Sequence, residues 1–172
     1  KDKMILCQES NRAESAGNYI SSGAIAADAT LAEMLSCGIE YLGDKEPFFI
    51  MCEGGDIDWG GHGNKIMPVV TTVIAFDEAI KAAFEFYKKH PKETLIVVTA
   101  DHETGGVSIG EGKDWRPEII DWAMLEKHWF ESGEKNVLSY EENREMNKKA
   151  LIGWTSSHHT AARVPAFAIG KG

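Results

Sequence analysis

The chain has 172 residues, a formal net charge of −9 and a hydrophobic content of 43%. This length suits one globular domain with a real core, and the composition excludes a long disordered polymer. The acidic balance argues against nucleic acid as a partner, because a nucleic-acid surface needs clustered Lys and Arg. No apolar run approaches the roughly 20 residues that a membrane span needs. The three cysteines exclude a disulfide framework and leave the compartment open.

The N-terminal third of the chain predicts a loop-rich stretch, one helix and one strand. Residues 1–29 are rich in Ser, Gly, Asn and Ala and read as loop. Thr30 and Glu33 have the spacing of a capping box, which predicts a helix over about 30–42 that Gly43 ends. The run 48–52 is continuously apolar, as in strands that are buried on both faces of a parallel sheet.

The strongest helical period in the sequence follows. Apolar residues recur at intervals of three and four from Ile66 to Tyr87, and Pro91 then stops the helix. Residues 94–100 read as a second buried strand. The order strand, long helix, strand predicts a βαβ unit. The expected fold class is therefore α/β, as part of a doubly wound, mostly parallel sheet with helices on both faces.

Two further helices and a last strand complete the pattern. Pro117 has the place of a first helical residue, in a helix that includes Ile119 to Phe130 and can continue to Gly133. Ser139 and Glu142 form another capping-box pattern, which begins a short polar helix to about Lys149. The run 164–169 predicts a third strand, ended by Gly170. We expect residues 1–172 to form a single domain, and both ends look cut from a longer chain.

Three clusters of acidic residues and histidines lie beside the predicted strands. The first includes Glu53, Asp58 and His62 within a glycine-rich stretch, and a helical turn would place Asp58 and His62 on one face. The second is Asp101 and His102, and the third is the histidine pair His158 and His159. Ligands of open α/β sheets bind beyond the carboxyl ends of the strands, so the first two clusters should share one rim. The third reaches that rim only if its loop or an antiparallel strand places it there.

Carboxylate and imidazole ligands together suit zinc, non-haem iron or manganese. Two ions roughly 3.5–4 Å apart on such a rim would suit the hydrolysis of phosphate esters. Each cluster also has a structural explanation, since Asp101 and His102 can cap the next element and glycine runs are common connectors. The joint occurrence of the three clusters favours metal binding over those separate explanations.

Three motifs in the sequence resemble those of the alkaline phosphatase family. They are Phe-Phe-Ile-Met-Cys-Glu-Gly-Gly-Asp-Ile-Asp-Trp-Gly-Gly-His at 48–62, Val-Val-Thr-Ala-Asp-His-Glu-Thr-Gly-Gly at 97–106 and Trp-Thr-Ser-Ser-His-His-Thr at 154–160. Their order and rough spacing match the second half of that family, over about residues 28–172. The resemblance implies a phosphomonoesterase with two zinc ions and one magnesium, of whose catalytic domain this chain is a C-terminal fragment.

The resemblance also implies roles for six residues. Asp58, His62 and His159 would bind the first zinc, with His158 as the neighbouring choice for the third ligand. Asp101 and His102 would bind the second zinc, and Glu53 the magnesium. Trp59 departs from relatives that often carry His or Lys there.

The serine nucleophile of the family belongs to an Asp-Ser-Ala type motif in its first half. No such motif is found here, since Ser15 in Glu-Ser-Ala lacks the surrounding apolar strand. We therefore expect no catalytic nucleophile in this chain and no activity of the fragment alone.

Two alternatives stay open at this stage. The first is another hydrolase or mutase with a similar two-metal rim, such as a phosphodiesterase, a sulfatase or a phosphomutase, and the second is a metal-binding module without catalysis. The resemblance implies a phosphate monoester as substrate and a periplasmic or extracellular location. Uncovered sheet edges would favour self-association into a homo-oligomer.

Overall fold

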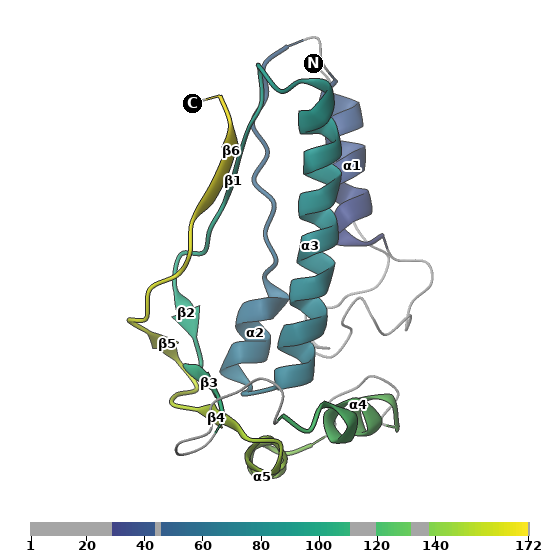
Figure 1. The fold of residues 1–172 in the computed structure, drawn as a ribbon. Coiled ribbons are helices and arrows are strands. Elements are labelled where there is room, and N and C mark those ends of the chain that lie inside the picture. The colour runs from purple at the N-terminus through teal and green to yellow at the C-terminus, as the bar shows by residue number, and fades with distance from the viewer. Residues whose placement is uncertain (1–28, 44–45, 111–119, 132–137, 172) are drawn as a thin grey trace.

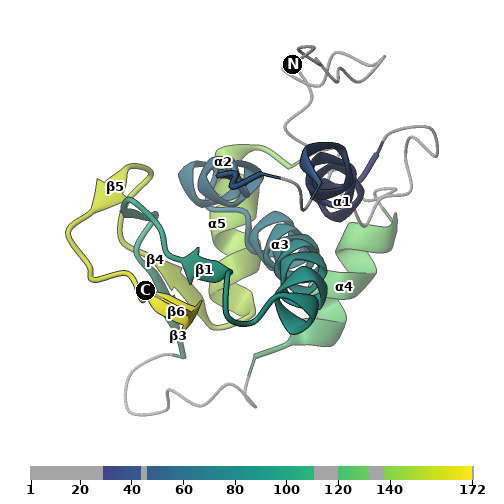
Figure 2. The same ribbon diagram turned by 90° about the horizontal axis from the view of Figure 1, so that it is seen from above.

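The computed structural model describes residues 29–43, 46–110, 120–131 and 138–171. These residues are arranged around one long helix, α3 (Ile66–Lys89), as Figure 1 shows. Helix α1 (Leu31–Leu42) packs along one side of α3, and strand β1 (Leu95–Val98) lies along another side, as Figure 2 shows from above. The loop-rich stretch expected at the N-terminus lies outside the described residues, except for Ala29.

Helix α1 begins and ends where its local signals predict. Thr30 Oγ1 accepts the Glu33 N–H at 3.1 Å, and the Thr30 N–H donates to Glu33 Oε2 at 2.7 Å. The Thr30 N–H and the Thr30 hydroxyl, which both donate to the Glu33 carboxylate, hold the pKa of that carboxyl below its usual range, because they favour its charged form. Gly43 follows the helix at φ 65°. The predicted helix over 30–42 is confirmed.

The other predicted helices are confirmed, with one later start. Helix α5 (Tyr140–Lys149) has the expected capping box between Ser139 and Glu142. Helix α4 (Trp122–Glu131) begins later than the sequence pattern predicts. Asp121 Oδ1 accepts the Met124 N–H at 2.9 Å, so an aspartate in the capping position starts the helix there. Pro117 and Gly133 lie outside the described residues.

The predicted strand at 48–52 is wrong as a paired strand in the described part of the chain. These residues are extended but belong to no ladder. The Phe48 ring lies 5.6 Å from that of Phe86 on α3, whereas Phe49 is 87% exposed and Met51 is 80% exposed. The run is thus covered on one face only, although its apolar character is continuous.

The described strands form three two-stranded antiparallel ladders, which corrects the expected parallel pairing. β1 pairs with β6 (Phe167–Gly170), β2 (Glu103–Thr104) with β5 (His159–Thr160), and β3 (Val107–Ile109) with β4 (Ile152–Trp154). The ladders follow one another along the same two segments, 95–109 and 152–170, as Figure 1 shows. A continuous apolar run indicates that a strand is buried, but it does not indicate whether its partner strand runs parallel or antiparallel. Here the chain reverses between β3 and β4, so the paired strands are antiparallel.

The buried core lies where the start of α3 meets α4, the end of α5 and β4. Its members come from α3, α4 and β4, from the second residue before α4 and from the residue directly after α5: Ile66, Met67, Ile120, Leu125, Trp129, Ala150 and Ile152. This core holds β4, and β3 through its pairing with β4, against the helices near the start of α3, which lies beside α2 (Asp56–His62) in Figure 1. None of the described helices is long and apolar enough to cross a membrane.

Replacing Leu125 with alanine tests this core. Leu125 has no exposed surface, so Leu125→Ala should lower the free energy of unfolding by about 2–5 kcal/mol. Denaturant unfolding followed by tryptophan fluorescence measures the change. Glu126→Ala on the exposed face of the same helix is the matched control and should change stability by about 0.5 kcal/mol or less. Equal effects of the two variants would contradict the position of the core.

Candidate metal centre

The glycine-rich stretch after Glu53 folds into the short helix α2. Asp58 and His62 therefore lie on one face, with Asp58 Oδ2 3.4 Å from His62 Nε2. Gly61 lets this helix approach β2 closely, because a Cβ at Gly61 would lie 2.9 Å from the Thr104 carbonyl oxygen. Gly105, at φ 91°, has its missing Cβ position 2.9 Å from the carbonyl oxygen of Gly61. The helix and the strand meet backbone to backbone.

Strand β5 carries His159 to the same place. Thr104 pairs with His159 and Glu103 with Thr160, in antiparallel register. The Glu103 carboxylate accepts the Gly106 N–H at 2.9 and 3.1 Å and also accepts the hydroxyl of Thr160. These bonds tie the turn after β2 to β5. The antiparallel strand, one of the two routes open from the sequence, brings the third cluster to the first two.

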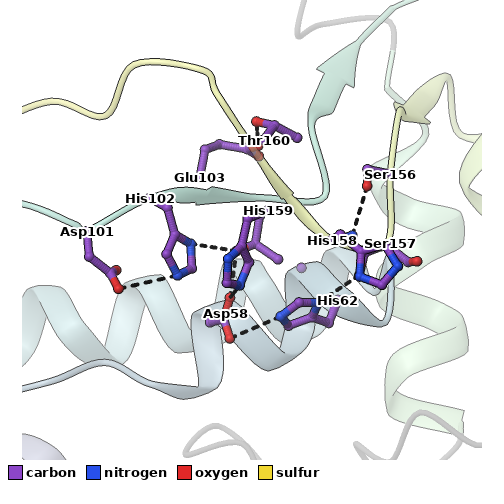
Figure 3. A network of polar contacts seen from close by, with 12 residues as sticks. Asp58, His62, Asp101, His102, Glu103, Ser156, Ser157, His158, His159 and Thr160 are labelled. Atoms are coloured by element: carbon purple, nitrogen blue, oxygen red, sulfur yellow. Dashed lines mark hydrogen bonds and ion pairs between the residues drawn. The ribbon is translucent and has the colours of Figure 1, made fainter.

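Asp58, His102 and His159 form the one group of potential metal ligands found among the described residues. One ligand atom from each lies within 4.8 Å of the others. The rings of His102 and His159 stack with centroids 3.5 Å apart, and His159 Nε2 lies 3.8 Å from Asp58 Oδ1 (Figure 3). The Asp58 side chain is 38% exposed and that of His159 is 52% exposed, so the group is open to solvent.

His62 lies beside this group with its ring orientation fixed. Its Nδ1 lies 2.7 Å from the backbone carbonyl oxygen of Ser157 (Figure 3). A carbonyl oxygen only accepts, so Nδ1 must carry a proton, and Nε2 faces Asp58 Oδ2. Metal-binding histidines commonly hold their second nitrogen in this way. The His62 ring lies 5.1 Å from that of His159, centroid to centroid.

Asn64, which is 2% exposed, holds the loop before β5 against the end of α2. Its side-chain amide donates to the carbonyl oxygens of Gly61 at 3.1 Å and Ser156 at 2.8 Å. Its Oδ1 accepts the hydroxyl of Tyr140 at 3.2 Å, and its backbone carbonyl accepts the amide of Asn147 at 2.7 Å. Asn64 adopts φ 50°, a left-handed conformation that Asn tolerates.

The structure places the other predicted residues at the margin of this group. The Asp101 side chain is 86% exposed, with Oδ2 3.3 Å from His102 Nε2. Glu53 is exposed at the end of the extended segment, just before α2, and is not a member of the group. The His158 ring lies 6.4 Å from that of His62, and its backbone carbonyl accepts the Gly105 N–H at 3.0 Å.

Three residues of the site were not singled out from the sequence. They are Glu103, Thr104 and Asn64. Thr104 follows His102 by two, the spacing that places strand residues on one face, so the sequence did carry a signal for it. The roles of Glu103 and Asn64 depend on partners more than 50 residues away, which no local pattern reveals.

The donor set fits a divalent metal ion. One carboxylate and two imidazoles converge without any thiolate, which suits a zinc site with room for water or substrate. Glu103, by contrast, has its oxygens engaged by Gly106 and Thr160 and anchors the strands. The arrangement can gather cations at an exposed rim and so hold an anionic oxygen of a substrate.

The chain belongs to the alkaline phosphatase family, whose model matches residues 18–172. It is similar to alkaline phosphatase 3 of Bacillus subtilis (strain 168), with 34% identity over 183 residues that cover 82% of this chain and 39% of the relative. It is also similar to the repressible alkaline phosphatase of Saccharomyces cerevisiae, with 47% identity over 64 residues, 37% of this chain and 11% of that protein.

Solved structures agree with this membership. A cold-active alkaline phosphatase from Shewanella sp. matches with a TM-score of 0.66 and 25% identity, over 86% of this chain and 46% of that one. The alkaline phosphatase of the Antarctic bacterium TAB5 matches with a TM-score of 0.55 and 31% identity, over 81% of this chain and 33% of that one. The chain thus spans less than half the length of these relatives.

Replacing Asn64 tests how the site is held together. Asn64→Ala removes an amide that two carbonyl oxygens share and leaves the Tyr140 hydroxyl without this partner, so we expect unfolding to become easier by about 2–4 kcal/mol. Calorimetry or denaturant unfolding measures the loss. Asn64→Gly lacks the amide but adopts φ 50° freely, and its difference from Asn64→Ala isolates the backbone contribution. A fully stable Asn64→Gly would show that the amide bonds do not hold the loop.

Proposed function

We propose that this chain is part of a metal-dependent enzyme that hydrolyses phosphate monoesters. The observation that carries the proposal is the convergence of Asp58, His102 and His159 from three separate segments. Membership of the alkaline phosphatase family supports the reaction class. Phosphoryl transfer depends on positioning and on stabilising charge, and an open group of metal ligands supplies both.

We propose two zinc ions and one magnesium as the cofactors. Asp58, His62 and His159 would hold the first zinc, Asp101 and His102 the second, and Glu53 the magnesium. The group in the structure takes members from both proposed zinc sites, which supports their being neighbours. A mutant of the TAB5 enzyme is described with Mg bound in its M3 site. Bound metal would supply Lewis-acid stabilisation of the phosphoryl oxygens.

The nucleophile of the proposed reaction lies outside this chain. Relatives more than twice as long support this, since the chain covers 39% of the Bacillus subtilis protein. The same missing part would complete a larger, mostly parallel sheet around the extended segment 46–53 and β1. Exposed apolar side chains on both, such as Met51 and Val97, support that completion. We also propose a periplasmic or extracellular location, which cell fractionation of the native host tests.

Asp58→Asn tests the metal-dependent reaction. The substitution removes the carboxylate charge but keeps the size, so the full-length protein should lose the zinc of its first site, and its hydrolysis of a phosphate monoester should fall at least about 100-fold. Metal analysis and a chromogenic phosphate ester measure the two quantities. Asp77→Asn, on the exposed surface of α3, is the matched control and should change neither. Activity retained by Asp58→Asn would refute the proposal, and a preference for diesters or sulfate esters would redirect it.

The isolated chain provides a separate test of the missing nucleophile. It should bind zinc weakly, turn over no phosphate ester and self-associate through its uncovered strands and exposed apolar side chains. Light scattering and the same chromogenic assay measure these properties. Efficient turnover by residues 1–172 alone would place a nucleophile within this chain, and a well-behaved monomer would contradict the uncovered sheet.

A further inference from the structure

The hydroxyl of Thr104 lies between two members of the metal-ligand group. Thr104 Oγ1 is 2.5 Å from Asp58 Oδ1 and 3.2 Å from His102 Nδ1. The side chain is partly buried, and the backbone on either side is held by the ladder with β5 and by the contact with Gly61. The hydroxyl therefore touches an α2 residue and a residue of its own segment at once.

The donors and acceptors of this contact can be assigned from the chemistry of the groups. A carboxylate only accepts, so the single proton of the Thr104 hydroxyl must go to Asp58 Oδ1. The hydroxyl oxygen then has lone pairs alone to offer His102, and the Nδ1 of His102 must carry a proton. The other nitrogen of His102, Nε2, faces the carboxylate of Asp101, the second proposed ligand of the same zinc, with Oδ2 at 3.3 Å.

We propose that Thr104 is a positioning residue, whose hydroxyl fixes both the tautomer of His102 and the orientation of the Asp58 carboxylate for metal binding. The proposal rests on the proposed function, in which Asp58 and His102 serve different zinc ions. One hydroxyl then couples the two metal sites. The Ser157 carbonyl oxygen fixes the Nδ1 proton of His62 in a similar way. That acceptor belongs to the backbone, so no side-chain substitution removes it.

Three threonine variants of the natural full-length protein separate the hydroxyl from the shape of the side chain. Thr104→Val keeps the volume and removes the hydroxyl, whereas Thr104→Ser keeps the hydroxyl. Thr155→Val is the matched control, because the Thr155 hydroxyl donates to the Gly106 carbonyl oxygen at 3.3 Å and touches no ligand of the group. Unfolding midpoints confirm that each variant folds before the site is measured.

Two readouts report on the site without relying on activity. The first is nitrogen NMR of the metal-free protein with labelled histidine, at a pH of about 8.5, where an ordinary imidazole is neutral. His102→Gln identifies the signal of His102. The second is zinc affinity, measured by competition with a chelator of known strength.

We expect the wild-type protein and Thr104→Ser to show His102 protonated at Nδ1. Thr104→Val should populate both tautomers and bind zinc about 10- to 100-fold more weakly, with Thr155→Val unchanged. Zinc affinity that is unchanged in Thr104→Val overturns the proposal, and so does failure of Thr104→Ser to preserve it. A wild-type protein that binds no zinc would overturn the proposed function instead, and the His102 signals would then decide the role of Thr104 by themselves.

Discussion

The candidate site depends on one non-local constraint, the antiparallel pairing of Thr104 with His159. Without it, Asp58, His102 and His159 would belong to three unrelated stretches of chain. The Glu103 carboxylate secures the pairing, because it accepts hydrogen bonds both from the turn at Gly106 and from Thr160 on the opposite strand. The close contact of Gly61 with β2 then sets the distance from α2 to the ladder. A carboxylate next to the candidate metal-ligand group thus stabilises the strands and is not a member of the group itself.

Two oxygens that accept from ring N–H groups give the imidazoles of this site their orientation. The Ser157 carbonyl requires a proton on Nδ1 of His62, and the Thr104 hydroxyl, once committed to Asp58, requires one on Nδ1 of His102. These contacts orient the two rings without a bound ion, so the proposed metal binding would have less order to impose. Asn64 ties the site to the helices behind it, because its side-chain amide bonds the loop at Ser156 and its backbone carbonyl bonds Asn147 on α5. The site is open to solvent at its ligands and rigid behind them.

Local signals were sufficient for helices α1, α3 and α5 but not for the strands. The capping boxes at Thr30 and Ser139 and the period of α3 depend on residues within a turn or two, and the structure has each helix where they predict it. The pairing of Asp58 with His62 on one helix face is equally local. The direction of the strands is not, since an apolar run such as that at 94–100 reads the same beside a parallel or an antiparallel partner. For the same reason the sequence left open how His159 reaches the rim, and it gave Glu103 no role at all.

Two segments with exposed apolar side chains, 46–53 and β1, lead toward the candidate metal centre. The extended segment 46–53 and β1 both run toward the end of the molecule that holds α2, as Figure 1 shows; the first ends at Glu53, and Asp101 follows soon after the end of β1 at Val98. Both carboxylates are exposed there, and Asp101 is 86% exposed in its side chain. Ligands of open α/β sheets bind at the carboxyl ends of neighbouring strands. Apolar side chains that remain exposed along the two segments, Phe49 and Val97 among them, need a cover that the described residues do not supply. If the additional strands proposed above run parallel to these two segments, their carboxyl ends would bring polar residues to the same rim, beside the two carboxylates that the present group leaves outside.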